Sequence, residues 1–237
     1  MYWDPLYFLV IAMFFIAMVA QNKVKRTYSK FSQVASERGI TAERAVQMVL
    51  DYYGITDVSI QQIPGELTDN YNPKTNIISL SEPVAGSTSI AAIGVACHEA
   101  GHAAQHATGY LPIKIRNSIV PICNIGSRLG IPLAIIGIIL QTSVSGMWET
   151  GQALIYAGII MYGFAFLFQF VTLPTELDAS HRALKVIDER DILSKDEREG
   201  AKKVLTAAAM TYVVALATAL VNLLRFAYIF LGRGRRR

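Results

Sequence analysis

Cysteine and charge are both scarce in this chain of 237 residues. The two cysteines, Cys97 and Cys123, are too few for a disulfide framework or for a zinc site built from several thiolates. Charged residues make up 17% of the chain against 52% hydrophobic residues, and the mean hydropathy is +0.35. This balance is too apolar for an ordinary soluble protein of the same length, so it indicates a membrane protein.

The hydrophobic residues are concentrated in four long runs. Because about 20 apolar residues cross a bilayer as a helix, we expect a multi-pass protein of the cell membrane, mainly α, with about four transmembrane helices. No basic residue precedes the first run and no small-residue cleavage site follows it, which favours a retained anchor over a removed signal peptide. The runs are Pro5–Ala20, Ile119–Gln141, Ala153–Val171 and Leu205–Leu231.

Basic residues indicate the orientation of these helices. Four of them lie between positions 23 and 30, after the first run, and Lys114 and Arg116 precede the second run. Lys and Arg are enriched in cytoplasmic loops, so residues 21–112 should face the cytoplasm, and a hairpin of the second and third runs returns the chain there at Pro174. A fourth span would carry the basic C-terminal tail outward, against this rule, so the path of the last run stays open.

The chain has a net charge of +4, and its basic residues lie next to the hydrophobic runs. Basic residues flank the hydrophobic runs, which is typical of contact with anionic lipid headgroups. No basic face is visible on a folded domain, so we expect the lipid bilayer as a partner and no nucleic acid. The sequence does not indicate an oligomeric state.

The runs divide the chain into five parts. The two parts between runs that should face the cytoplasm contain about 120 residues together, enough for one compact catalytic domain of α+β type. The parts are an N-terminal anchor (1–20), a catalytic segment (21–112), a transmembrane hairpin (113–173), a second cytoplasmic segment (174–204) and a C-terminal membrane segment with a basic tail (205–237).

Local patterns predict the elements of the catalytic segment. Apolar residues at helical spacing behind an N-cap residue favour helices, and alternating patterns favour strands. The second strand could offer an exposed edge to an extended substrate over 77–80, or it could be an ordinary core strand. The expected elements are a helix from Thr41 to Gly54, a strand over 58–63, a turn at 70–73, a strand over 76–81 and a helix over 89–105.

The segment His98-Glu99-Ala100-Gly101-His102 is the most informative part of the chain. Residues four apart lie on one face of a helix, so both imidazoles can bind one metal ion. Glu99 then lies beside the metal, where it can take a proton from metal-bound water. The chain has only four histidines, which makes an accidental match rare. The pattern predicts a hydrolase with one zinc ion per chain.

A catalytic zinc needs a third protein ligand and one open position. His106 lies four residues beyond His102, but one straight helix does not easily place three residues around a tetrahedral ion. Glu176 is the better candidate, because two membrane crossings return it to the side of His102 and a carboxylate from a second helix commonly joins two motif histidines. We also expect Pro174 to break the third span and Thr175 to cap a new helix. The alternative role for Glu176 is to stabilise that helix N-terminus.

Five segments over nearly the whole chain form a specific combination: Leu67–Pro73, Ile78–Ser81, His98–His102, Asn124–Gly130 and Leu173–Ser180. In this combination the chain resembles the bacterial YugP-like neutral zinc metallopeptidases, integral-membrane proteins distantly similar to the HtpX and CAAX prenyl proteases.

The resemblance implies His98, His102 and Glu176 as zinc ligands and Glu99 as catalytic base. In the wider clan an acidic residue commonly lies four places after the glutamate ligand, where this chain has Ser180. Asp178 and Ser180 are therefore both candidates for orienting a ligand imidazole.

Together these residues predict a zinc metallopeptidase, an endopeptidase acting on membrane-associated proteins or peptides from the cytoplasmic side. Tyr110, His181 and Arg182 lie close enough in sequence to the ligands to be candidate oxyanion donors. One alternative is a non-catalytic zinc-binding membrane scaffold or chaperone, although metal binding alone does not require Glu99. Another is a channel-like protein, which leaves the two histidines of the motif unexplained.

Overall fold

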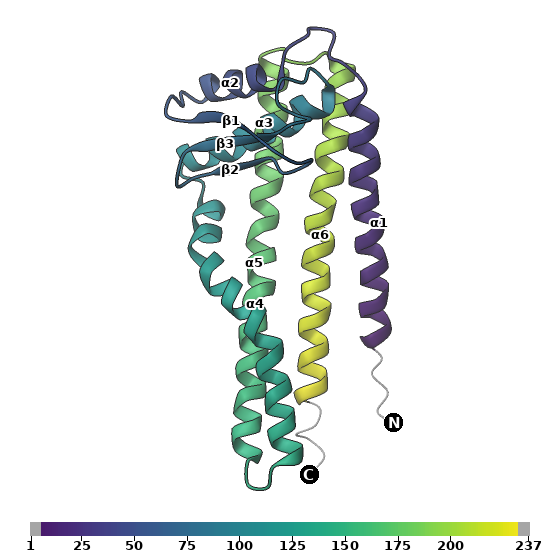
Figure 1. The fold of residues 1–237 in the computed structure, drawn as a ribbon, viewed down its shortest axis with the longest axis vertical. Coiled ribbons are helices and arrows are strands. Elements are labelled where there is room, and N and C mark those ends of the chain that lie inside the picture. Colours follow the sequence, from purple (N-terminus) through teal and green to yellow (C-terminus); the bar gives the residue numbers. More distant parts are fainter. Residues whose placement is uncertain (1–5, 232–237) are drawn as a thin grey trace. The chain divides into compact units, whose positions relative to one another are not determined.

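The computed structural model describes residues 6–231 (Figure 1). The mainly α class is confirmed. The beginning of the predicted anchor at 1–5 and the basic tail after position 231 lie outside the described residues. The elements in chain order are α1 (Leu6–Ser32), α2 (Ala42–Tyr52), β1 (Ser59–Ile63), β2 (Asn70–Asn72), β3 (Ile77–Ser81), α3 (Ile90–Ala107), α4 (Leu111–Ser143), α5 (Trp148–Glu189) and α6 (Lys195–Leu231).

Within residues 6–231, four helices are long and apolar enough to cross a membrane: α1, α4, α5 and α6. Their number agrees with the four predicted runs. Large apolar side chains on them are exposed, among them Phe14, Ile139 and Ile160, and an exposed apolar surface of this kind fits contact with lipid. Insertion into a membrane and the cytoplasmic orientation of the remaining segments stay predictions.

The chain forms two compact units. One unit comprises residues 19–114 and 174–211. We call it the mixed unit, because it contains both helices and strands. The helical unit comprises residues 115–173 with the N-terminal part of α1 and the C-terminal part of α6. All residues that the sequence predicts to act in catalysis lie in the mixed unit.

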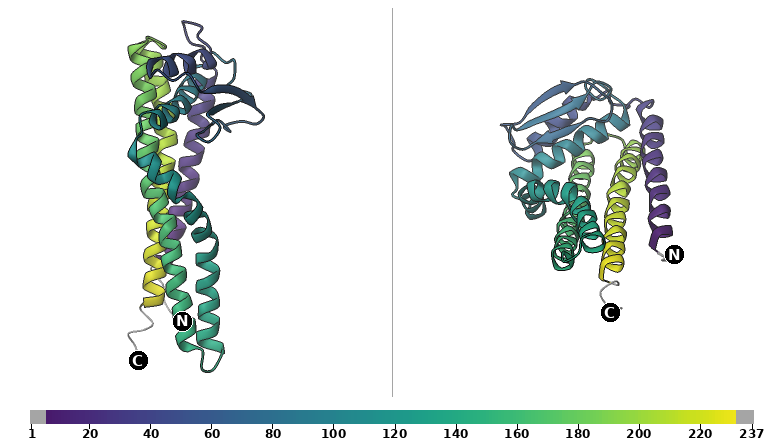
Figure 2. Two further views of the ribbon diagram at one scale, coloured as in Figure 1. Left: turned by 90° about the vertical axis from the view of Figure 1, so that its left-hand side faces the viewer. Right: turned by 60° about the horizontal axis from the view of Figure 1, so that its bottom comes forward.

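In the helical unit, α4 and α5 form an antiparallel hairpin (Figure 2). Glycines bring their backbones into contact. A Cβ atom at Gly126 would lie 2.5 Å from the carbonyl oxygen of Met161, and one at Gly158 would lie 2.5 Å from that of Gly130. Small residues at helix interfaces permit this close approach, which is the usual means of association where apolar side chains face lipid.

The sheet of the mixed unit has the strand order β1-β3-β2. The central strand β3 runs parallel to β1 and antiparallel to β2. The predicted turn at 70–73 is therefore wrong over Asn70–Asn72, which pair with β3. The suggestion of a free substrate edge on β3 is wrong as well, because β3 has a strand on each side. Asp69 directly precedes β2, and its carboxylate accepts hydrogen bonds from the backbone N–H and the hydroxyl of Ser81 (2.8 and 2.9 Å).

The sheet packs on α3, which lies at the centre of the mixed unit (Figure 2). Thr41 is the N-cap of α2, as predicted, and Ser89 is the N-cap of α3. The Thr41 hydroxyl accepts a hydrogen bond from the Arg44 N–H, and the Ser89 hydroxyl accepts one from the Ala92 N–H. The small alanine side chains of α3 let other helices and the sheet pack around it. The core around it contains Val49 and Leu50 of α2, Ile78 and Leu80 of β3, Val186 and Ile187 of α5, and Leu205 of α6.

Helix α5 continues through Pro174, so the predicted helix break at this residue is wrong. A proline inside a helix removes one backbone hydrogen bond and costs ~3 kcal/mol. The turns that follow bury Val186 and Ile187 completely, and burial of each such side chain contributes about 1.5–3 kcal/mol. Packing in the core therefore outweighs the local preference of proline.

Gly101 and Gly94 of α3 provide a matched pair of positions. A Cβ atom at Gly101 would lie 2.5 Å from the Ala179 backbone oxygen on α5, whereas one at Gly94 would lie 3.2 Å from the Ala201 Cβ on α6. We expect Gly101→Ala to lower the free energy of unfolding by about 1–3 kcal/mol through overpacking. Gly94→Ala should cost much less, because alanine favours a helix over glycine by about 1 kcal/mol. Thermal unfolding in detergent measures both, and equal effects would contradict the close α3–α5 contact.

Candidate metal centre

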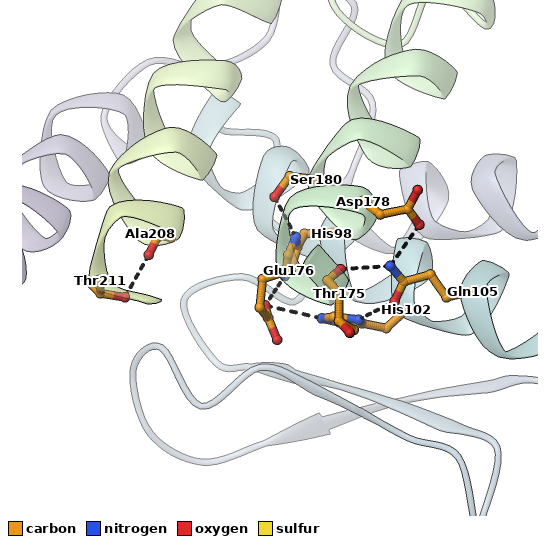
Figure 3. Close-up of polar contacts among 9 residues, drawn as sticks. All are labelled: His98, His102, Gln105, Thr175, Glu176, Asp178, Ser180, Ala208 and Thr211. Atoms are coloured by element: carbon orange, nitrogen blue, oxygen red, sulfur yellow. Dashed lines mark hydrogen bonds and ion pairs between the residues drawn. The ribbon is translucent and has the colours of Figure 1, made fainter. Parts of the chain in front are cut away.

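His98, His102 and Glu176 meet inside the mixed unit (Figure 3). The two histidines lie one turn apart on α3, and Glu176 projects from α5. The Glu176 Oε2 atom lies 3.2 Å from the His98 Nε2 and 3.5 Å from the His102 Nε2. His102 and Glu176 are buried, and His98 is partly buried. The arrangement joins two helices that are far apart in the sequence.

These distances suit a tetrahedral zinc ion. Ligands held 2.0–2.1 Å from such an ion lie about 3.3–3.4 Å from one another. The two measured nitrogen–oxygen distances fall on either side of this value, and two imidazoles with one carboxylate are a common donor set of zinc hydrolases. The three residues present therefore fit zinc and leave a fourth position for water or substrate.

Each histidine is oriented by a hydrogen bond to its other ring nitrogen. The His98 Nδ1 lies 3.1 Å from the Ser180 hydroxyl, and the His102 Nδ1 lies 3.0 Å from the Gln105 Oε1 (Figure 3). Because an amide oxygen only accepts, the Nδ1 of His102 carries the proton and its Nε2 is left to bind metal. Such partners hold a ligand ring in its binding orientation.

Gln105 connects the motif helix to α5. It is fully buried, and its Nε2 donates to the Thr175 carbonyl oxygen (2.7 Å) and to the Asp178 carboxylate (2.9 Å). Asp178 also accepts a hydrogen bond from the Arg182 Nε (2.6 Å). Asp178 thus acts on His102 through Gln105 and does not contact the imidazole directly. The sequence reasoning missed Gln105, although its position three residues after His102 places both on one helix face.

Glu99 is buried within α3, next to His98. Burial raises the pKa of Glu99 above its usual value, and the charges of the two histidines act in the opposite direction. Burial also lowers the pKa of His102, but the hydrogen bond and charge of Glu176 outweigh it and raise the pKa overall. Protons therefore compete with a metal ion for His102.

The remaining candidate residues lie outside the ligand group. His106 is exposed, with its Nδ1 3.4 Å from the Tyr71 hydroxyl, and His181 is exposed on α5. The Arg182 guanidinium lies over the Tyr110 ring at 5.6 Å, so these two predicted oxyanion candidates contact each other. Burial raises the pKa of the Cys97 thiol to about 12, which makes it inert as a nucleophile.

Gln105→Met should weaken metal binding by roughly 10- to 100-fold, because it removes the acceptor of the His102 Nδ1 proton while nearly preserving volume. Competition with a chromogenic zinc chelator measures the affinity. Gln47→Met serves as the control. It is the same substitution on α2, where the side chain donates a hydrogen bond to Asp51 and lies outside the metal-binding group. Equal zinc affinity in both variants and in the wild type would contradict the positioning role of Gln105.

Comparison with known proteins leads to the same chemistry. Residues 6–231 match the family described as "Putative neutral zinc metallopeptidase". The "Putative membrane protease YugP" of Bacillus subtilis (strain 168) is 41% identical over 225 residues, which cover 95% of this chain and 96% of that protein. No solved structure matches the chain. The family match spans the whole described range and includes both helices that carry the ligand group. The chain belongs to this neutral zinc metallopeptidase family.

Proposed function

We propose that the chain is a membrane-bound zinc endopeptidase that hydrolyses peptide bonds of membrane or membrane-proximal proteins. The convergence of His98, His102 and Glu176 in one buried group carries this proposal. The position of Glu99 between the two histidines in sequence supports catalysis over a purely structural metal, because a structural site needs no additional carboxylate.

His98, His102 and Glu176 would hold the zinc ion. When bound, zinc lowers the pKa of a water molecule to near 7 and polarises the substrate carbonyl. Glu99 accepts a proton from the attacking water as the water oxygen bonds to the carbonyl carbon. It then delivers this proton to the leaving amine as the C–N bond breaks.

Helix α5 supports a site close to the membrane surface. The third apolar run ends at Val171 and the helix continues without interruption to Glu176. In the sequence, Glu176 follows the end of this run by five residues. The substrates would therefore be juxtamembrane segments or hydrophobic chains held at the bilayer. The basic residues after the first run favour the cytoplasmic side.

Glu99→Gln separates the enzyme from a zinc-binding scaffold. We expect this variant to retain zinc and to lose activity by roughly 100- to 10,000-fold, because the general base is removed while the ligands stay. Cleavage of a fluorescently labelled unfolded protein by the full chain in lipid nanodiscs measures the activity. Wild-type cleavage that a chelator abolishes should precede this comparison, and unchanged chelator-sensitive cleavage by the variant would exclude Glu99 as the base.

The zinc content of the purified full chain tests the ligand set. We expect about one zinc per chain in the wild type and a large loss in Glu176→Ala, because removing one of three ligands weakens the site. His106→Ala is the matched control and should keep its zinc, since His106 lies outside the group. Elemental analysis with circular dichroism as a check of folding provides the measurement. Loss of zinc from His106→Ala together with retention of zinc in Glu176→Ala would identify His106, and not Glu176, as the third ligand.

A further inference from the structure

A basic groove lies in the mixed unit and shares no residue with the metal-binding group. It is formed by the C-terminal half of α1 and the first turns of α6, and its volume is about 450 Å³. Small-ligand sites typically measure ~300–1,000 Å³. Its charged lining residues are Lys23, Arg26 and Lys30 of α1, and Glu199, Lys202 and Lys203 of α6.

The two walls are held together by packing. A Cβ atom at Gly200 would lie only 2.9 Å from the Phe31 ring, so α1 and α6 touch beside the groove. The Glu197 carboxylate on α6 accepts a hydrogen bond from the Glu37 N–H, in the loop that follows α1 (2.7 Å). It also accepts one from the Ser194 N–H (2.8 Å) and so caps its own helix. Packing and hydrogen bonds within the mixed unit therefore hold the two walls of the groove in place.

Its charge is strongly one-sided. Glu199 is the single acidic side chain of the lining, and it is paired with Lys202 at 3.3 Å. Lys23, Arg26 and Lys30 recur at helical spacing on one face of α1, opposite Lys203 of α6. Like charges gathered in this way repel one another, and an anion with several acceptor oxygens relieves the repulsion.

The position of the groove along both helices identifies the anion. In α1 the apolar run ends at Ala20, three residues before Lys23, and in α6 the apolar run begins at Leu205, two residues after Lys203. Both helices are candidate membrane spans, so these positions correspond to the level of lipid headgroups. We propose that this groove binds the phosphate headgroup of an anionic phospholipid. The proposal depends on neither zinc nor catalysis.

Lipid binding to the full chain tests this site. The protein in uncharged detergent is titrated with a short-chain phosphatidylglycerol and with phosphatidylcholine of the same chain length, and bound lipid is measured by native mass spectrometry. We expect the wild type to retain phosphatidylglycerol in preference. The triple variant Lys23→Gln/Arg26→Gln/Lys203→Gln should bind it roughly tenfold more weakly or worse, since each basic side chain near an anionic headgroup contributes several-fold.

The matched control is Arg44→Gln/Lys74→Gln/Lys195→Gln. It removes the same charge from exposed positions outside the groove, and it should bind phosphatidylglycerol as the wild type does. Glu199→Gln removes the one competing carboxylate and should tighten binding several-fold. If the groove variant Lys23→Gln/Arg26→Gln/Lys203→Gln does not fold, as judged by circular dichroism, Glu199→Gln decides whether the groove binds the headgroup.

Two results would overturn the proposal. Equal weakening in both triple variants, or equal affinity for the two lipids, would mean that the surface attracts lipid only through diffuse charge. Displacement of phosphatidylglycerol by inorganic phosphate at equal concentration would identify a soluble phosphate as the ligand instead. Retained selectivity with a loss confined to the groove variant supports the headgroup site.

Discussion

The contact between α3 and α5 at Gly101 is the constraint on which the metal-binding group depends. Gly101 lies inside the motif, between Glu99 and His102, and Ala179 lies three residues after Glu176. Because a side chain at Gly101 would meet the Ala179 backbone, the absence of one lets the two helices approach closely enough for Glu176 to reach both imidazoles. The motif thus supplies two ligands, and its glycine leaves the space that lets Glu176 approach them.

This close approach places several polar groups in a dry environment, where each needs a partner. The structure meets that need by linking them. Gln105 accepts from His102 and donates to Thr175 and Asp178, while Asp178 accepts from Arg182. A buried network in which the members satisfy one another restricts side-chain rotation more than isolated hydrogen bonds do. Such a network holds the metal-binding atoms in fixed positions.

Much of this site could be predicted because its logic is local or topological. The four-residue spacing of the histidines follows from helix geometry. Glu176 was the better candidate because a carboxylate from a second helix commonly joins two motif histidines and the predicted crossings return it to their side. Gln105 was missed because its spacing places it on the face of His102 but does not reveal the non-local contacts with Thr175 and Asp178 that hold it. The strand at Asn70–Asn72 was missed for a similar reason, since three residues carry too little alternation and their pairing with β3 is non-local. At Pro174 a correct local rule gave a wrong helix end because core packing overrides it.

The unbroken α5 has a functional consequence under the proposed mechanism. A helix break at Pro174 would free the Glu176 carboxylate from the rest of α5, whereas the continuous helix holds Glu176 in fixed register with Asp178 and Ala179. Helix α3 is fixed to the same turn of α5 through Gly101 and Gln105. Under the proposed function, a substrate peptide bond would therefore have to reach a fixed group of two histidines from α3 and one carboxylate from α5.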